Sequence, residues 1–441
     1  MSGDTIYALS SGAGLAGGAV VRVSGADADA LLVALGVGAL PEARRAELRV
    51  LSSGDGPIDR ALVLRFPGPE SFTGEDVAEL HIHGGPSVIE SLFAAISGTG
   101  LARHSEPGEF TRRAFENGKL DLTAAEGLAD LVAARTDAQR RLALRQYDGA
   151  LADLYEGWRA LLVDLMGHAE AEIDFSDEEL PEGLKAKTYA RVAALRDEIV
   201  RHMDAGERGE RIRSGFPIVI LGAPNVGKSS IINRLANSEV AIVSEAAGTT
   251  RDVIEVQLNL GGFAVTLSDT AGIRDARDDI EAEGVRRAEQ RAADAALCVV
   301  VLDARYETVP ERIAALITDD CLVVANKRDL LVGSDVPVDL HREPLLVSAA
   351  TGEGLNELLE RLTEEVRSRL GGSEAPLPTR QRHREALAEA AAALAQVPES
   401  AYPELAAEEV RLALRAIGRI TGRVDIDEVL DTVFRDFCIG K

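Results

Sequence analysis

The stretch Gly222-Ala-Pro-Asn-Val-Gly-Lys-Ser229 decides how the rest of the chain is interpreted. It fits the phosphate-binding pattern G-x-x-x-x-G-K-[ST]. An apolar, β-branched run at residues 216–221 precedes it, and residues 228–235 have the pattern of a helix start. Such a loop needs a strand before it and a helix after it, because its backbone N–H groups and the helix dipole then converge on phosphates. The motif predicts that Lys228 contacts the β- and γ-phosphates and that the Ser229 hydroxyl binds Mg²⁺.

Strand and helix patterns alternate around this loop. Residues 253–260 and 263–268 predict a hairpin around Gly261-Gly262. Continuous apolar runs predict three buried strands, at residues 296–302, 321–325 and 344–349. This alternation predicts a doubly wound α/β domain over residues 215–372, bounded by flexible glycines.

A second motif predicts which base is bound. Asn326, Lys327 and Asp329 match the guanine-reading motif of GTPases, and Ser348-Ala349 matches its supporting loop. An aspartate carboxylate can accept hydrogen bonds from the N1–H and the exocyclic N2–H₂ of guanine, a pair of donors that adenine lacks. The motif therefore predicts selection of GTP over ATP.

Two further segments match the switches of GTPases. Thr250 is placed to join Ser229 on Mg²⁺, Asp269 is placed to act on the metal through other ligands, and the Gly272 N–H is placed to contact the γ-phosphate. Ras-like enzymes have a glutamine directly after this glycine, which orients the attacking water. Ile273 occupies that position here and cannot do so, so another group must orient the water.

Composition bounds the class of protein. The chain has 441 residues, enough for roughly two to four domains, and with 46% hydrophobic but 4% aromatic residues its cores must be mainly aliphatic. No stretch reaches the ~18 apolar residues of a membrane span, and the first residues lack the segments of a signal peptide. Cys298, Cys321 and Cys438 lie in unrelated contexts, which argues against a disulfide framework. We therefore expect a cytoplasmic protein without membrane attachment.

Charge restricts how the chain can meet nucleic acid. The formal net charge is −25, so nonspecific coating of nucleic acid is not expected, because phosphate binding needs clustered Lys and Arg. A role on RNA therefore requires a local basic patch or a partner protein. Lysine is scarce, with six residues at positions 119, 185, 187, 228, 327 and 441. We expect the retained lysines to be needed for their own chemistry.

The first 120 residues mix strand and helix patterns. Residues 19–23 and 61–66 predict strands, residues 77–82 alternate like a half-buried strand, and Pro86 is placed to open a helix over residues 87–96. The region is therefore predicted to be α+β.

Two polar segments, at residues 69–85 and 107–121, carry candidate site residues in this region. His81 and His83 share a strand face, but two histidines without a third ligand favour structural roles over a metal site. Arg112, Arg113 and Lys119 are equally consistent with an anion site and with a solvated helix face.

Helical periodicity dominates the rest of the chain. Thr123-Ala-Ala-Glu126 predicts a capping box, followed by helix to about residue 171 with one break near Asp148-Gly149. Further helices are predicted at residues 184–207, 379–395, 403–420 and 425–437. The simplest arrangement is one helical domain that the nucleotide-binding insert interrupts.

Together these segments resemble the MnmE (TrmE) family of tRNA-modification GTPases over essentially the whole chain. The most specific matches are the phosphate-binding loop and the segments at residues 71–76, 107–113, 117–119 and 438–441. The resemblance implies a multidomain protein with α/β and all-α parts. Its parts would be an α+β folate-binding and dimerisation domain (1–120), a discontinuous helical domain (121–214 and 373–441), and an inserted doubly wound P-loop GTPase domain (215–372).

The resemblance also implies an activity and partners. The chain would be a GTP-hydrolysing tRNA-modification enzyme and a homodimer that forms a heterotetramer with the MnmG flavoprotein. The complex would add an aminomethyl or carboxymethylaminomethyl group to C5 of the wobble uridine of certain tRNAs. The implied cofactors are GTP, Mg²⁺, K⁺ and a tetrahydrofolate derivative, in its 5-formyl or methylene form, as the carbon source.

The resemblance assigns site residues by position. The implied folate ligands are Arg22, Glu79, Lys119 and Lys441. The implied K⁺ ligands are Asn225, Ser244, Ala246 and Thr249, those of Mg²⁺ are Ser229 and Thr250, and Glu281 would orient the hydrolytic water. Motifs and resemblance together place the following residues at GTP: Asn225, Val226, Gly227, Lys228, Ser229, Ser230, Ser244, Glu245, Ala246, Ala247, Gly248, Thr249, Thr250, Asp269, Thr270, Ala271, Gly272, Asn326, Lys327, Asp329, Ser348 and Ala349.

Other interpretations stay open at this point. A ribosome-assembly GTPase would share Asn225, but no G-x-x-G of an RNA-binding KH module follows the insert, and the net acidity opposes direct rRNA binding. A stand-alone folate enzyme with a regulatory GTPase domain is a second alternative. For catalysis, Arg251 or Arg274 would be the arginine finger if K⁺ does not fill that role.

Overall fold

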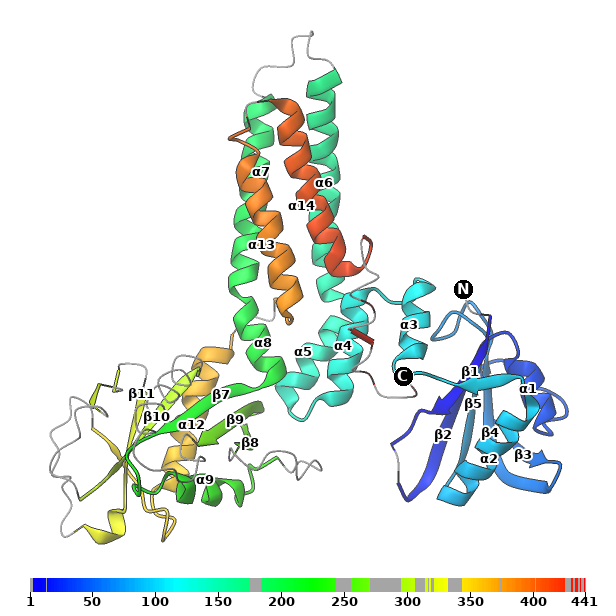
Figure 1. Cartoon of the computed structure of the whole chain (residues 1–441), viewed down its shortest axis with the longest axis horizontal. Helices are drawn as coiled ribbons and strands as arrows, with labels where there is room; N and C mark the ends of the chain where they lie inside the picture. The colour runs from blue at the N-terminus through cyan, green and yellow to red at the C-terminus, as the bar shows by residue number, and fades with distance from the viewer. Residues whose placement is uncertain are drawn as a thin grey trace, which may run out of the picture. The chain divides into compact units, whose positions relative to one another are not determined.

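The computed structural model of the chain (Figure 1) divides into two compact units. One comprises Met1–Ala129, Gln146–Ala193 and Glu389–Lys441, and the other Asp130–Arg145 and Ala194–Ala388. The structure describes residues 3–12, 14–174, 184–242, 255–269, 295–305, 314–315, 317–318, 321–331, 343–372, 375–400, 402–424, 430, 433–434, 437 and 440.

The first unit begins with a six-stranded sheet of order β3-β4-β5-β2-β1-β6, in which only β1 and β6 pair in parallel. Its strands are β1 (Thr5–Leu9), β2 (Ala16–Ser24), β3 (Glu47–Ser53), β4 (Gly56–Phe66), β5 (Val77–Gly84) and β6 (Ala102–His104). Helices α1 (Ala28–Ala34) and α2 (Pro86–Thr99) pack on one face over an aliphatic core. The predicted strands within β2, β4 and β5 are confirmed, and Pro86 does open α2.

The helices that follow are α3 (Glu109–Glu116), α4 (Leu122–Ala133), α5 (Asp137–Tyr147), α6 (Ala150–Asp174), α7 (Leu184–Asp204), α8 (Gly206–Ser214), α13 (Gln381–Gln396) and α14 (Pro403–Thr421). In the first unit, α14 packs along α6 (Figure 1). The break predicted at Asp148-Gly149 is confirmed, whereas a second break at residues 134–136 was not expected. The helix predicted at residues 425–437 lies largely outside the described residues. None of the helices that the structure describes is both long and apolar enough to span a bilayer.

The predicted capping box at Thr123 is wrong. Thr123 lies inside α4, and the cap is Asp121, whose Oδ1 accepts from the backbone N–H groups of Thr123 (2.7 Å) and Ala124 (3.2 Å). An aspartate before the first turn satisfies these free donors and also favours the positive end of the helix dipole.

The capping box lies one helix later, at Thr136-x-x-Gln139. Gln139 Oε1 accepts from the Thr136 N–H at 3.2 Å, and the Thr136 Oγ1 accepts from the Gln139 N–H at 3.5 Å. This reciprocal pair starts α5, which explains the second break in the helical region.

The second unit contains a sheet of order β12-β11-β10-β7-β9-β8, parallel except for β8. Its strands are β7 (Phe216–Leu221), β8 (Glu255–Leu260), β9 (Phe263–Asp269), β10 (Leu297–Asp303), β11 (Cys321–Asn326) and β12 (Leu345–Leu346). Helices α9 (Lys228–Ala236) and α12 (Leu355–Leu370) and the short 3₁₀ helix η1 (Arg328–Leu330) follow β7, β12 and β11. Apolar clusters on both faces confirm the doubly wound α/β fold.

Strand β12 is shorter than the predicted 344–349. Ser348 and Ala349 leave the sheet because their backbone N–H groups bond elsewhere: that of Ser348 donates to the Glu353 carbonyl at 2.9 Å and that of Ala349 to Asn326 Oδ1 at 3.0 Å. The chain thus leaves the ladder where the predicted supporting loop of the guanine-reading motif begins.

Candidate nucleotide-binding site

The phosphate-binding loop joins β7 to α9, as predicted. Gly227 has φ +98°, and a Cβ atom there would lie 2.2 Å from the Nδ2 of Asn326. Asn225, at the tip of the loop, has φ +63°. The loop therefore needs a residue without a side chain at Gly227, so that Asn326 can pack against its backbone.

Lys228 is held inside the loop. Its Nζ donates to the carbonyls of Gly222 (2.9 Å) and Ala223 (3.0 Å), and the residue is 6% exposed. Burial lowers the pKa of the ammonium, and the Asp269 carboxylate partly opposes that shift. The flexible stem thus places one compact cation at the concave side of the backbone N–H groups, where phosphates would bind.

Two residues predicted to act on Mg²⁺ are in contact. The Ser229 Oγ donates to Asp269 Oδ2 at 2.6 Å, and Asp269, the last residue of β9, is fully buried. A hydroxyl and a carboxylate are the hard oxygen donors that Mg²⁺ prefers. The donor set therefore fits the predicted metal.

Asn326 braces the two halves of the site. Its Nδ2 donates to the Val226 carbonyl at 2.8 Å, while its Oδ1 accepts from the Ala349 N–H at 3.0 Å. The side chain is nearly fully buried. Both of its polar ends are thus used to fix the phosphate loop against the base-reading loops.

Lys327 and Asp329 complete the base-reading side. The Lys327 Nζ donates to the Asn225 carbonyl at 2.7 Å and to Asp303 Oδ2 at 2.8 Å. Asp329 accepts from the Ser348 hydroxyl, which orients its carboxylate. The structure therefore brings the phosphate loop, Asp269, the 326–329 motif and Ser348-Ala349 together in one site.

Asp303 belongs to this site and was not predicted. Its side chain is fully buried, and the hydrogen bond from Arg305, together with that from Lys327, holds the pKa of the carboxyl well below its usual range. The residue ends β10 directly opposite Asn326 in the parallel register. Asp303 could have been predicted as a site residue from this position, because it lies at the carboxyl end of a buried strand next to β11, which carries Asn326.

Several predicted residues lie outside the described part of the chain. These are the switch residues Ser244, Glu245, Ala246, Ala247, Gly248, Thr249 and Thr250, the segment Thr270, Ala271 and Gly272, and Glu281, Lys441 and Cys438. Ile273, Arg251 and Arg274 also lie outside it.

The N-terminal sheet carries a second group of predicted site residues. Arg22 on β2 and Glu79 on β5 are direct cross-strand neighbours, and the Arg22 guanidinium donates to Glu79 Oε1 at 2.9 and 3.1 Å. The same guanidinium lies over the rings of Phe72, at 5.2 Å, and Phe110, at 5.9 Å. His81 is the next residue on this face and contacts Glu79 at 3.3 Å. The predicted pair is thus fixed in one orientation.

The chain terminus reaches the same sheet. The Gly440 carbonyl accepts from the Ser10 Oγ at 2.9 Å, and a Cβ at Gly440, which has φ +97°, would lie 2.1 Å from the Leu9 carbonyl oxygen. The residue before Lys441 is therefore docked at the end of β1. Lys119 lies beside the loop at Gly74, where a Cβ would lie 3.5 Å from its Cγ.

Arg113 is part of neither an anion site nor a solvated helix face, the two roles that the sequence left open for it. The residue is 5% exposed and forms ion pairs with Glu75 (3.0 Å) and Glu109 (2.9 Å). Arg113 is therefore an internal brace between α3 and the 69–76 loop. Arg112, in contrast, pairs with Glu116 on the solvated face of α3.

The structural roles predicted for the two histidines agree with their contacts. His83 pairs with Asp59 at 2.8 Å, and His81 with Glu79. In the part of the chain that the structure describes, no group of three or more His, Cys, Asp or Glu side chains is arranged to hold a metal ion.

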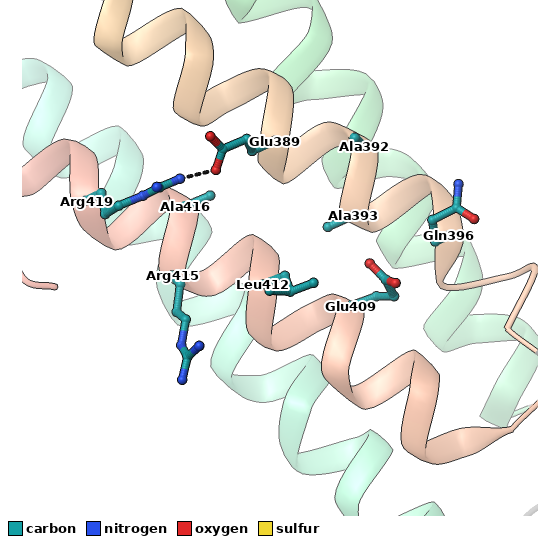
Figure 2. Close-up of a pocket in the computed structure, with 9 residues that line it drawn as sticks. All are labelled: Glu389, Ala392, Ala393, Gln396, Glu409, Leu412, Arg415, Ala416 and Arg419. Carbon is teal, nitrogen blue, oxygen red and sulfur yellow. Dashed lines mark hydrogen bonds and ion pairs between the residues drawn. The ribbon is translucent and has the colours of Figure 1, made fainter. Parts of the chain in front are cut away.

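A hollow of about 490 Å³ lies between α13 and α14 (Figure 2). Leu412, Ala393 and Ala416 form its apolar part, and an ion pair between Glu389 and Arg419 closes one end. It shares no residue with either predicted site.

Comparison with known proteins covers the whole chain. Residues 5–119 match the family model described as GTP-binding protein TrmE N-terminus, and residues 122–438 match that of the MnmE helical domain. A protein of Paramagnetospirillum magneticum named tRNA modification GTPase MnmE is 54% identical over 441 residues, which covers 99% of this chain and 100% of the relative. A protein of the same name from Rhodospirillum rubrum is 53% identical over the full length of both chains. The chain therefore belongs to the MnmE (TrmE) family.

Proposed function

We propose that the chain is a GTP-hydrolysing enzyme of tRNA modification. The observation that carries the proposal is the Asn326 brace, which fixes the phosphate loop against the guanine-reading residues. Asn326 makes these bonds in a chain whose relatives, at 54% and 53% identity, are named tRNA modification GTPases. The fold supports this activity, because the phosphate loop lies at the carboxyl ends of the parallel strands.

The finer chemistry extends this proposal. The chain would act with the MnmG flavoprotein as a heterotetramer and add an aminomethyl or carboxymethylaminomethyl group to C5 of the wobble uridine. The tetrahydrofolate derivative would supply the carbon. A cytoplasmic location, where tRNA is available, is part of the same proposal.

Each residue of the nucleotide site has a proposed task. Lys228 balances the charge of the β- and γ-phosphates, and Asp329 reads the guanine edge. Ser229 and Thr250 would hold Mg²⁺, and Asn225, Ser244, Ala246 and Thr249 would hold K⁺. These cations would neutralise the charge that develops on the phosphate oxygens. Glu281 is proposed to orient the attacking water.

A folate site in the N-terminal sheet is proposed from two features. Arg22 and Glu79 present a fixed cation and carboxylate beside Phe72, so a planar, hydrogen-bonding ring would find both polar and aromatic partners. The docked Gly440 would bring Lys441 to the same sheet. Lys119 completes the proposed set.

A homodimer is supported by an apolar surface on the same sheet. Leu48 and Leu62 are cross-strand neighbours, 60% and 45% exposed, and Val50 on the same face is 47% exposed. Burial of this surface against a second copy would remove it from water. The proposed domains are residues 1–120, 121–214 with 373–441, and 215–372.

Mass analysis of tRNA nucleosides tests the function. Cells lacking this protein should lose the C5 modification of the wobble uridine, and the wild-type chain should restore it. Normal modification in the deletion strain would overturn the proposal.

A further inference from the structure

Three segments beside the nucleotide-binding insert are basic in a chain that is otherwise strongly acidic. They are residues 130–145, 206–214 and 375–388, which together carry ten arginines and five acids, whereas the whole chain has a formal charge of −25. The arginines, called the basic surface below, are Arg135, Arg140, Arg141, Arg145, Arg208, Arg211, Arg213, Arg380, Arg382 and Arg384. The acids are Asp130, Asp137, Glu207, Glu210 and Glu385.

Hydrogen bonds hold the three segments together within one compact unit. The Gln139 Nε2 donates to the Arg213 carbonyl at 2.9 Å, which joins α5 to α8. The Arg213 Nε in turn donates to the Thr379 carbonyl at 2.8 Å, and Arg384 pairs with Glu210 at 2.7 Å. The arginines of three segments that are distant in sequence thus form one region.

The outer part of this region is α5. Arg140 and Arg141 are 54% and 58% exposed and share one carboxylate, that of Asp137. Arg135 is also exposed and donates to Gln257 Oε1, a neutral partner, at 2.7 Å. The three exposed arginines Arg135, Arg140 and Arg141 therefore outnumber the one carboxylate that Arg140 and Arg141 share.

The shape of this charge fits a polymer better than a small anion. On α5, Arg140, Arg141 and Arg145 extend over about 7.5 Å at 1.5 Å per helical residue, and Arg135 lies before the start of the helix, so the charge is spread more widely than one phosphate group. Guanidinium groups match phosphate oxygens in a bidentate geometry. A nucleic-acid backbone would engage several of them at once and release counterions.

We propose that the basic surface binds the phosphate backbone of tRNA. The inference rests on the proposed function, since it identifies where an acidic enzyme would hold its RNA substrate. The contact is independent of base sequence and serves to orient the tRNA.

The test uses the full-length protein and an unmodified tRNA transcript, with binding followed by fluorescence anisotropy over a range of salt concentrations. Arg140→Glu with Arg141→Glu should weaken binding about 10-fold or more at 0.1 M salt and reduce the slope of log K against log salt by about 2. Arg140→Lys with Arg141→Lys keeps the charge but loses the bidentate contacts, so it should bind more tightly than the glutamate pair and more weakly than the wild type. GTP turnover without tRNA should not change in either variant.

Arg361→Glu is the control, and Arg140→Glu alone, which changes the net charge by the same amount, is compared with it. Arg361 is also 54% exposed and pairs with Glu364 and Glu365 on α12, outside the three segments. It should leave tRNA affinity close to the wild-type value. The inference is overturned if the α5 double reversal binds as the wild type or the control does, or if the wild-type chain binds no tRNA. Neither result affects the nucleoside analysis, so the proposed function would stand or fall separately.

Discussion

The Nδ2 of Asn326 donates to the Val226 carbonyl at 2.8 Å, although 100 residues separate the two in sequence. One buried amide thereby ties the phosphate-binding loop to the strand end that carries the guanine-reading motif. Its Oδ1 extends the link to Ala349. Together with the bond from the Lys327 Nζ to the Asn225 carbonyl, this amide holds the phosphate loop against the 326–329 motif.

Asn326→Asp should break this link while keeping side-chain shape. The carboxylate can still accept from Ala349, but it cannot donate to Val226 and would place a charge in a buried position. We expect the free energy of unfolding to fall by about 1–3 kcal/mol and GTP affinity to fall at least ~10-fold, as measured by denaturation and nucleotide titration.

Asn259→Asp is the control for that substitution. Asn259 is exposed, and its Oδ1 accepts from the Gly262 N–H, a bond that aspartate retains. It should change stability and GTP affinity little. Equal effects of the two substitutions would show that Asn326 is not a specific brace.

Gly440→Ala should detach the chain terminus from the N-terminal sheet. A Cβ there would lie 2.1 Å from the Leu9 carbonyl oxygen at a φ of +97°, so the terminus must move. We expect folate binding, followed by calorimetry, to weaken at least ~10-fold, with GTP affinity unchanged. Gly100→Ala has the same unfavourable sign of φ, +67°, but no neighbouring atom within 4 Å, and should leave folate binding intact. Normal folate binding by Gly440→Ala would remove Lys441 from the site.

Stability should fall in a defined acidic range because of His202. Burial, and secondarily the nearby His383, lower the pKa of His202 to about 4, below its ordinary value of 6.5. The unfolded chain therefore takes up this proton first, and stability that is present above pH 6.5 is lost as the pH falls toward 4. His202→Gln should reduce the slope of unfolding free energy against pH in this range, by up to ~1.4 kcal/mol per pH unit. An unchanged slope would contradict the assignment.

GTP turnover should depend on K⁺ if Asn225 is a ligand of that ion. Asn225 is exposed at the tip of the loop, and its backbone is fixed by the bond from Lys327. Turnover should rise with K⁺ but not with Na⁺ at matched ionic strength, and Asn225→Ala should lose the difference. Equal rates in both salts would favour Arg251 or Arg274 as the group that stabilises the transition state.

The nucleotide-binding fold was predictable because its signals are local. A pattern of a few residues is enough to predict each of its parts: the loop at Gly222–Ser229, the hairpin before Asp269 and the buried strands. Asp303 was not predicted, because its importance depends on lying beside Asn326 in the sheet. Pairing between strands cannot be read from one segment alone.

The helical and N-terminal regions show the same limit. Thr123 and Thr136 both begin patterns that fit a capping box. Asp121 already caps α4 from a position before Thr123, so only the pattern at Thr136 forms the box. The burial of Arg113 depends on Glu75, 38 residues earlier in the chain. The cap at Asp121 lies within the local sequence, whereas the pairing of Arg113 with Glu75 follows from tertiary packing and leaves no local pattern.

Guanine recognition is proposed to depend on Asp329, and nucleotide titration of Asp329→Asn is the decisive experiment. An amide cannot accept from both guanine donors but suits the changed edge of xanthine. GTP binding should weaken by about 2–5 kcal/mol, and binding of xanthosine triphosphate should appear. Unchanged GTP affinity, with no gain for xanthosine triphosphate, would contradict it.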